Sequence, residues 1–224
     1  RFAKFEAAGR SPLYEKFALH VAQSPDILRF LEGLPPEKRQ PNLLFAAVRL
    51  LAGIPSSTAE LDDAINIYAN AICSVMLSRT TQTNEPGRCA SLLPSLASIP
   101  GPLALIEVGA SSGLCLLPDF YGYDWDRQRL VPPAQAIGIA PVFPCQAGIG
   151  VPLPTNFPEI VWRAGLDLNP LDVSKDDDVL WLENLVWPEH HQRLDRLRSA
   201  INIARQNPPR VVAGDLRNDL QALI

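Results

Sequence analysis

The segment from Leu103 to Gly113 constrains the fold of this chain more than any other. Leu103–Val108 is a short apolar run bounded by proline and glycine, as expected of a strand buried in a parallel sheet. Gly109–Gly113 follows as a turn, in which glycine lets the backbone approach a ligand closely. Because open α/β sheets bind ligands at the carboxyl ends of their strands, this turn predicts a binding site.

Two later segments predict further strands of the same sheet. Ile160–Leu168 and Arg210–Asp215 are apolar runs, and helical patterns occupy the chain between them. The alternation of strand and helix is typical of a parallel α/β layer. We therefore predict an α/β protein whose residues 101–224 form a Rossmann-like sheet. A parallel sheet normally has more than three strands, so we expect this one to be incomplete at its C-terminus.

Residues 1–100 predict a separate helical domain. Ser11 and Ser24 each precede a proline, which is a typical start of a helix, with serine as cap and proline in the first turn. A capping box opens a longer helix that we expect to run from Ser57 to about Ser78. Pro100–Pro102 then marks the expected domain boundary.

Seven prolines fall between residues 131 and 158. Proline lacks the backbone N–H that helices and central strands require. We therefore predict that 131–158 is an irregular insertion in the α/β domain, with edge strands or a hairpin.

The composition restricts the class of partner. The net charge is −4 and no run of lysine and arginine occurs, which argues against nucleic acid or an anionic membrane as partner. No apolar run reaches the roughly 18 residues of a membrane span, and no signal peptide is visible. The distant cysteines predict reduced thiols in a cytoplasmic protein, with no bound metal. The oligomeric state stays open. The cysteines are Cys73, Cys89, Cys115 and Cys145.

The turn after the first strand has a recognisable pattern. It lacks the Gly-Lys-Ser/Thr of a P-loop, which argues against nucleoside triphosphate chemistry, and it is not the full dinucleotide fingerprint. It resembles the first motif of S-adenosylmethionine-dependent methyltransferases, in which an acid precedes a Gly-x-Gly-x-Gly turn. Glu107 matches the acid, Gly109 and Gly113 match the outer glycines, and Ser111 replaces the middle one. The resemblance implies that these four residues bind S-adenosylmethionine.

Two aspartates extend this resemblance to the other strands. Asp167 matches the acid that binds the ribose hydroxyls, and a carboxylate suits that role because it accepts two hydrogen bonds. Asp167 follows Gly113 by 54 positions, whereas about 20 are usual, and the proline-rich insertion accounts for the excess. Asp124 or Asp126 fits the usual distance but follows no convincing strand. Asp215 matches the acid that contacts adenine, with capping of the next helix as the alternative.

The polar stretch from Thr80 to Glu85, with Arg88, is a second candidate. Asn84, Glu85 and Arg88 carry amide, carboxylate and guanidinium groups at one helix entry, where they are expected to face a substrate. Glu85 is the candidate general base. The alternative is a structural turn in which Thr83 or Asn84 caps the next helix.

Nearly the whole chain resembles a bacterial family catalogued as domain of unknown function 2332. Members of that family extend further at the C-terminus, and the resemblance implies no activity. The segments that carry it are Pro41–Val48, Arg79–Arg88, Leu105–Gly113 and Arg163–Asp172.

Three hypotheses of function follow. The first is an S-adenosylmethionine-dependent methyltransferase that acts on a small molecule. The second is a non-catalytic Rossmann-like protein that binds another nucleotide or metabolite, which Ser111 and the displaced Asp167 favour. The third is an interaction scaffold without a small ligand. The methyltransferase hypothesis depends on an analogy of fold and motif, which does not by itself establish chemistry.

Overall fold

The computed structural model describes residues 1–82, 84–133 and 140–223. The chain forms two compact units, each built from two stretches of sequence. Unit 1 comprises 1–82 and 180–191, and unit 2 comprises 83–179 and 192–224. The expected boundary at residues 100–102 therefore lies inside unit 2. Helix α6 (Cys89–Ala97), which precedes that boundary, packs against segments that follow the first strand.

The helices of unit 1 begin where the sequence predicts. Ser11 Oγ accepts a hydrogen bond from Tyr14 N at 3.1 Å, and Ser24 Oγ accepts one from Ile27 N at 3.5 Å. These two serine caps confirm the predicted starts. The elements of unit 1 before residue 83 are η1 (Ala3–Ala7), α1 (Pro12–Val21), α2 (Pro25–Glu32), η2 (Pro36–Lys38), α3 (Pro41–Ala52), α4 (Thr58–Ile67) and α5 (Ala69–Ser78).

The single helix predicted from Ser57 to Ser78 is wrong in one respect. Ser57 caps it as expected, but the helix breaks at Tyr68, whose φ of −106° and ψ of 18° are not helical. The break divides it into α4 and α5. Both halves pack against α3, and the bend lets both bury their apolar faces there.

Helix α3 is the centre of unit 1. Its residues Leu43–Val48 are all buried, as expected of a helix that is apolar all round. The stretch 180–191 adds Trp187, whose ring lies 5.9 Å from that of Tyr14 and whose Nε1 donates to Asn42 Oδ1 at 2.9 Å. Chain segments far apart in sequence thus share one aromatic core.

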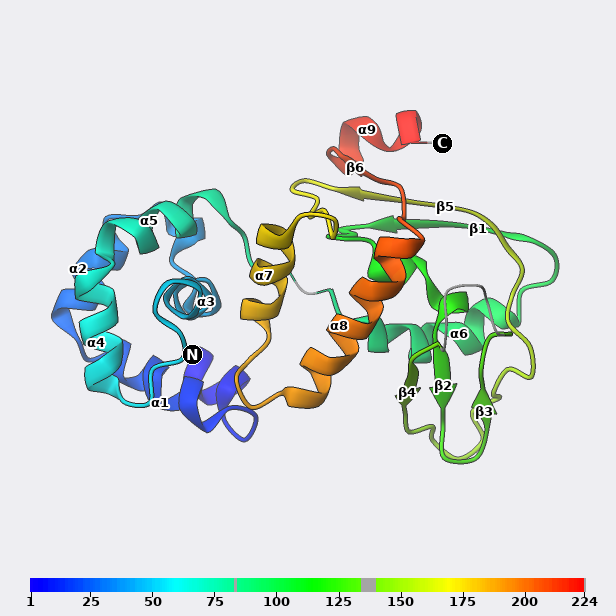
Figure 1. The fold of residues 1–224 in the computed structure, drawn as a ribbon, viewed down its shortest axis with the longest axis horizontal. Coiled ribbons are helices and arrows are strands. Elements are labelled where there is room, and N and C mark those ends of the chain that lie inside the picture. The colour runs from blue at the N-terminus through cyan, green and yellow to red at the C-terminus, as the bar shows by residue number, and fades with distance from the viewer. Residues whose placement is uncertain (83, 134–139, 224) are drawn as a thin grey trace. The chain divides into compact units, whose positions relative to one another are not determined.

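The main sheet of unit 2 has three parallel strands in the order β1–β5–β6 (Figure 1). They are β1 (Leu103–Val108), β5 (Ile160–Asp167) and β6 (Val211–Ala213), so the three predicted strands are confirmed. Helix α9 (Leu216–Leu223) packs against β5, where Leu220 and Leu223 meet Ala164 and Leu166. Since the strands are parallel, their carboxyl ends meet at one edge of the sheet.

The segment after the turn forms two short 3₁₀ turns, η4 (Leu114–Leu116) and η5 (Pro118–Phe120), in place of a regular helix. Arg163 of β5 holds both, because its Nη1 donates to Leu116 O at 2.8 Å and to Asp119 Oδ1 at 2.7 Å. Pro118 lacks a backbone N–H and so disfavours continuation of a helix through this position.

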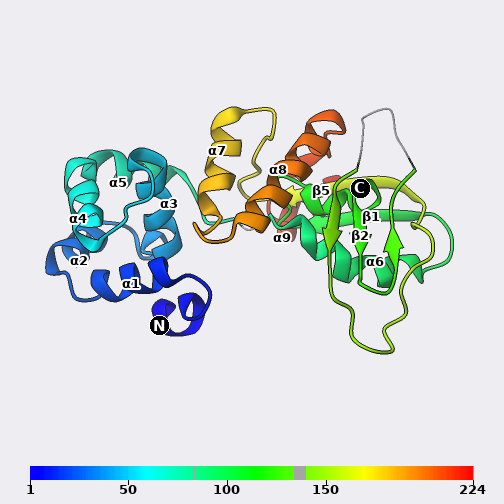
Figure 2. The same ribbon diagram turned by 60° about the horizontal axis from the view of Figure 1, so that its bottom comes forward.

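A second three-stranded sheet follows, in the order β3–β2–β4, as labelled in Figure 1 and seen from another side in Figure 2. Strand β2 (Gly122–Asp124) pairs antiparallel with β3 (Arg129–Leu130) and parallel with β4 (Val142–Pro144). The hairpin of β2 and β3 precedes the proline-rich stretch, which contributes the edge strand β4.

The chain contains three further helical elements, η3, α7 and α8. Helices α7 and α8 each contribute residues to both units, because residues 180–185 of α7 and His191 of α8 belong to unit 1. Among the described residues, no helix is long and apolar enough to cross a membrane. The remaining bounds are η3 (Pro86–Arg88), α7 (Asp176–Leu185) and α8 (His191–Gln206).

Candidate functional site

The turn after β1 has three residues with left-handed backbone. The φ angles of Gly109, Ser111 and Gly113 are +75°, +53° and +74°. Ser111 is the unusual one, because non-glycine residues seldom adopt a positive φ. The left-handed conformation at Ser111 is one that glycine adopts more readily than serine.

The two outer glycines have different surroundings. A Cβ on Gly109 would meet no described atom within 4 Å, so this position borders open space. A Cβ on Gly113 would lie 2.8 Å from both Pro209 and Val211. Gly109 is therefore available to a ligand, whereas Gly113 lets the turn pack closely against the start of β6.

The backbone N–H groups of the turn are largely occupied within the protein. Gly109 N and Ala110 N donate to Leu166 O, at 2.8 and 3.3 Å, and Gly113 N donates to Ala110 O at 2.7 Å. Ser111 N donates to Asp167 Oδ2 at 2.7 Å. A phosphate-binding turn presents such groups to its ligand. In this turn the carboxylate of Asp167 accepts the hydrogen bond of Ser111 N that a ligand would otherwise accept.

Asp167 is the last residue of β5 and Asp215 follows β6, so both lie at the carboxyl ends of the strands. Besides Ser111 N, Asp167 accepts a hydrogen bond from Asn169 N at 2.7 Å. Asp215 accepts one from Arg217 N at 2.9 Å and pairs with its guanidinium, which holds the pKa of Asp215 below its ordinary value. Asp215 thus occupies the start of α9, the geometry of the capping alternative.

Asn84 stabilises the turn after β1 through hydrogen bonds of its side chain. Its side chain is buried, and Nδ2 donates to Ala110 O and to Ser112 Oγ, each at 3.0 Å. The amide therefore fixes the turn directly. Thr83, the other cap considered from the sequence, lies outside the described residues.

Glu85 is held by two arginines. Its Oε2 lies 2.8 Å from Arg193 Nε and its Oε1 lies 3.2 Å from Arg196 Nε. Oε1 also accepts a hydrogen bond from Gly87 N at 3.0 Å, which caps η3. These contacts connect α8 to the entry of α6.

Glu107 has the most unusual environment in the site. Burial raises its pKa from about 4.5 to about 7, with Arg88 opposing the rise and Asp167 adding to it. Its Oε2 is buried and has no hydrogen-bond partner among the described residues, and the same is true of Ser111 Oγ. The sequence identified Glu107 as a site residue, but its burial and its raised pKa depend on the packed structure.

The structure thus brings most predicted site residues to one region. The turn, Glu107, Asp167 and Asn84 are joined by hydrogen bonds or electrostatic contacts, with Arg88 close enough to affect Glu107. Ser112 joins them as a partner of Asn84 that the sequence did not single out. Within the described part of the chain, no three His, Cys, Asp or Glu side chains are arranged to hold a metal ion.

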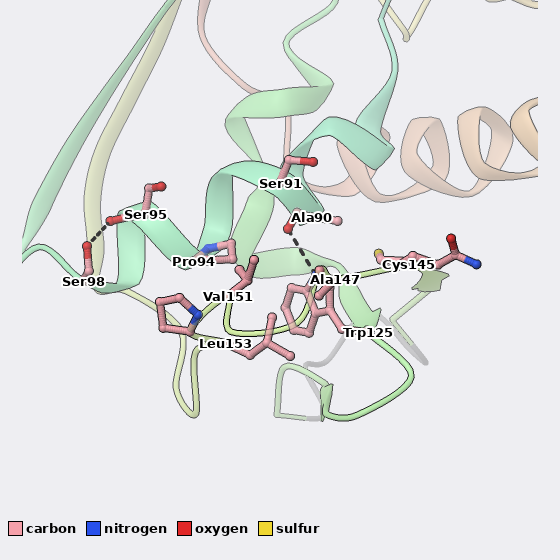
Figure 3. Close-up of a pocket in the computed structure, with 13 residues that line it drawn as sticks. Ala90, Ser91, Pro94, Ser95, Ser98, Trp125, Cys145, Ala147, Val151 and Leu153 are labelled. Atoms are coloured by element: carbon pink, nitrogen blue, oxygen red, sulfur yellow. Dashed lines mark hydrogen bonds between the residues drawn. The ribbon is translucent and has the colours of Figure 1, made fainter.

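A cavity of about 400 Å³ lies elsewhere in unit 2, between α6 and the segment 145–153 (Figure 3). Pro94 lies inside α6 and lacks the N–H that would otherwise donate a hydrogen bond to Ala90 O. Trp125 Nε1 donates to that carbonyl instead, at 3.2 Å. The predicted site residues are not among those that line this cavity.

Comparison with known proteins supports one assignment. A family model described as "Uncharacterized protein conserved in bacteria (DUF2332)" matches residues 1–224. No curated protein and no solved structure matches the chain. The family resemblance seen in the sequence is therefore confirmed, while the resemblance of the turn to methyltransferases stays a prediction. This chain belongs to the bacterial DUF2332 family.

Proposed function

We propose that unit 2 binds S-adenosylmethionine at the carboxyl ends of β1 and β5 and uses it to methylate a small molecule. The observation that carries this proposal is the buried Oε2 of Glu107, which lacks a hydrogen-bond partner among the described residues. Buried polar atoms in folded proteins are nearly always paired. A ligand that donates a hydrogen bond to Glu107 would satisfy this atom.

The charge of the site favours a cation over a phosphate. Asp167 lies close enough to Glu107 for its charge to raise the pKa of Glu107. Most N–H groups of the turn are hydrogen-bonded within the protein, so they offer little to an anion. S-adenosylmethionine carries ammonium and sulfonium groups and ribose hydroxyls. It therefore fits an edge rich in acceptors better than a nucleoside triphosphate does.

The geometry of the sheet supports the same ligand. The three parallel strands lie in the order β1–β5–β6, and such an order is compatible with one half of a Rossmann-like sheet. Gly109 borders open space at its edge, and Ser111 Oγ provides a second buried polar group without a partner among the described residues. Glu107 would accept a hydrogen bond from the ammonium or a hydroxyl, and Asp167 would add negative charge.

Little further chemistry is required of the protein. S-adenosylmethionine supplies an electrophilic methyl group when bound, and the transfer depends largely on how donor and acceptor are positioned. Arg88 is exposed and lies near Glu107, where it would face the substrate.

A non-catalytic binding protein is the second candidate. The observation that favours it is the engagement of the predicted substrate-facing residues in structural contacts. Asn84 supports the turn and Glu85 pairs with Arg193 and Arg196. On this alternative the same edge binds a nucleoside but transfers no methyl group.

Calorimetric titration tests the proposal directly. Wild-type protein is titrated at about pH 8 with S-adenosylmethionine, S-adenosylhomocysteine and ATP. We expect micromolar affinity for S-adenosylmethionine, weaker binding of the uncharged-sulfur homologue, and no binding of ATP. Glu107→Gln should lower the affinity for S-adenosylmethionine about tenfold, because a neutral amide cannot pair with a cation. Glu159→Gln, at an exposed glutamate, is the control.

The pH dependence adds a second criterion. Since the pKa of Glu107 is about 7, its ionised fraction grows about tenfold from pH 6 to pH 8, and the affinity should increase in parallel. Glu107→Gln should abolish this trend.

Binding of S-adenosylmethionine with no methyl transfer to any small molecule would support the second candidate. Equal affinity in wild type and Glu107→Gln would contradict both.

A further inference from the structure

Unit 1 contains a cavity of about 730 Å³ that the site in unit 2 does not involve. It lies among η1, α1, α2 and the start of α3. Its floor is formed by buried Phe2, Ala3, Leu44 and Phe45. Protein interiors are closely packed, and ligand pockets usually enclose about 300–1,000 Å³, so a cavity of this size is typical of a binding site.

The walls of the cavity are also apolar. Leu19 of α1 and Leu28 of α2 line it, and they are 44 % and 39 % exposed. Two large aliphatic side chains therefore border the space while remaining in contact with water. An apolar ligand in the cavity would remove both from water, which is favourable.

Cationic side chains complete the lining. Arg1, Lys4 and Arg39 are exposed and line the cavity, whereas Glu6 is its only acidic lining residue among those described. This local excess of positive charge contrasts with the net charge of −4 of the whole chain. The ligand that complements it has an apolar body and an anionic end.

Arg39 is held in position for such a ligand. Its Nε donates to Leu34 O at 2.8 Å and its Nη2 donates to Glu32 O at 3.0 Å. Its Nη1 and the Nζ of Lys4 have no hydrogen-bond partner among the described residues. An anion would therefore meet a guanidinium that is already oriented, which lowers the entropic cost of binding.

We propose that this cavity binds a long-chain fatty carboxylate, with its acyl chain over Leu44 and Phe45 and its carboxylate between Lys4 and Arg39. A discrete molecule fits better than a membrane surface, because the apolar floor is buried inside the helices of unit 1. The proposal uses none of the residues of the candidate S-adenosylmethionine site in unit 2. The fatty acid proposal and the methyltransferase proposal can therefore be tested separately.

The first test is calorimetric titration with four fatty acids, each below its micellar concentration. They are octanoate, decanoate, dodecanoate and tetradecanoate. Affinity should rise about fourfold for each methylene until the chain fills the cavity. The methyl ester of dodecanoate should bind at least about tenfold more weakly than the acid, because it cannot pair with a cation. Affinity independent of chain length would overturn the proposal, and so would equal binding of acid and ester.

Three variants test whether the fatty acid binds in this cavity. Ala22→Trp, at an exposed lining position after α1, should block it and lower the affinity for dodecanoate at least about tenfold. Lys4→Gln should weaken binding of the acid without affecting the ester. Lys16→Gln, at an exposed lysine of α1 outside the lining, is the matched control. Circular dichroism of each variant verifies that it is folded.

The outcomes separate the alternatives. Loss of dodecanoate binding in Ala22→Trp but not in Lys16→Gln supports the proposal. Wild-type affinity in Ala22→Trp contradicts it. Sedimentation with anionic phospholipid vesicles, together with no binding of free dodecanoate, would also overturn it in favour of a membrane surface.

Discussion

Glu107 lies on β1 opposite Gly165 of β5, and its environment decides its chemistry. Burial raises its pKa to about 7, the charge of Asp167 adds to the rise, and Arg88 partly compensates. A carboxyl group with this pKa changes its protonation near neutral pH. Near neutral pH it can hold a proton, whereas ordinary glutamates are fully ionised there. Once it is ionised, it can pair with a cation.

The pKa of Glu107 predicts a specific pH dependence of stability. The folded protein binds this proton more tightly than the unfolded chain, so the stabilisation is complete below about pH 4.5 and is lost as the pH rises through about 7. Glu107→Gln removes the effect. The free energy of unfolding of the variant, relative to wild type, should therefore increase by about 1–3 kcal/mol from pH 5 to pH 8.

Urea denaturation of both proteins at the two pH values measures this difference. Glu159→Gln, at an exposed position, should show almost none. A difference for Glu107→Gln that does not change with pH would mean that the carboxyl group has an ordinary pKa in the folded protein.

At the scale of elements, the turn between β1 and η4 is organised by backbone conformation. Gly109 and Gly113 have nearly the same φ, but one borders open space and the other faces Pro209 and Val211. Asp167 and Asn84 then fix the turn from two further segments. The turn is therefore held by contacts with other segments of unit 2 rather than by its own sequence alone.

The two glycines provide a matched comparison. Gly109→Ala should lower the free energy of unfolding by about 1 kcal/mol, the cost of a left-handed alanine. Gly113→Ala has the same backbone cost, and its Cβ also overlaps with Pro209 and Val211, so the loss should reach about 3 kcal/mol. Urea denaturation at one pH compares them. Equal losses would show that the start of β6 moves away at little cost.

At the scale of the whole molecule, each compact unit is built from two stretches of chain. Residues 180–191 return to unit 1 and contribute two tryptophans to it. Trp181 Nε1 donates to Thr80 O at 3.1 Å, and Trp187 packs with Phe2 and Tyr14 in the aromatic core. Unit 1 is therefore incomplete until the chain has passed through most of unit 2.

This division predicts how fragments behave. Residues 1–82 contain no tryptophan, and we expect them to fold poorly alone, because the aromatic core is left open without Trp187. A peptide of residues 180–191 should bind the fragment, raise its helical circular dichroism and shift its own tryptophan emission to shorter wavelength. A peptide carrying Trp187→Ala should bind at least about tenfold more weakly. Cooperative unfolding of 1–82 alone, unaffected by the peptide, would contradict this prediction.

Features that depend on near neighbours could be predicted from the amino-acid sequence. Strand β1 has the predicted bounds, and the serine caps of α1 and α2 are where the pattern places them, because capping and strand formation depend on a few adjacent residues. The sequence also determined membership of the bacterial family, which covers residues 1–224. It identified Glu107 and Asp167 as residues at the ends of neighbouring strands.

The contacts that those residues make depend on the packed fold. The break at Tyr68 lets two helices pack on α3, and Glu85 meets Arg193 and Arg196 from α8. Asn84, expected to face a substrate, supports the turn after β1. These outcomes depend on contacts between residues far apart in the chain, and so does the raised pKa of Glu107. No local pattern contains that information, because burial and charge pairing exist only once the chain is packed.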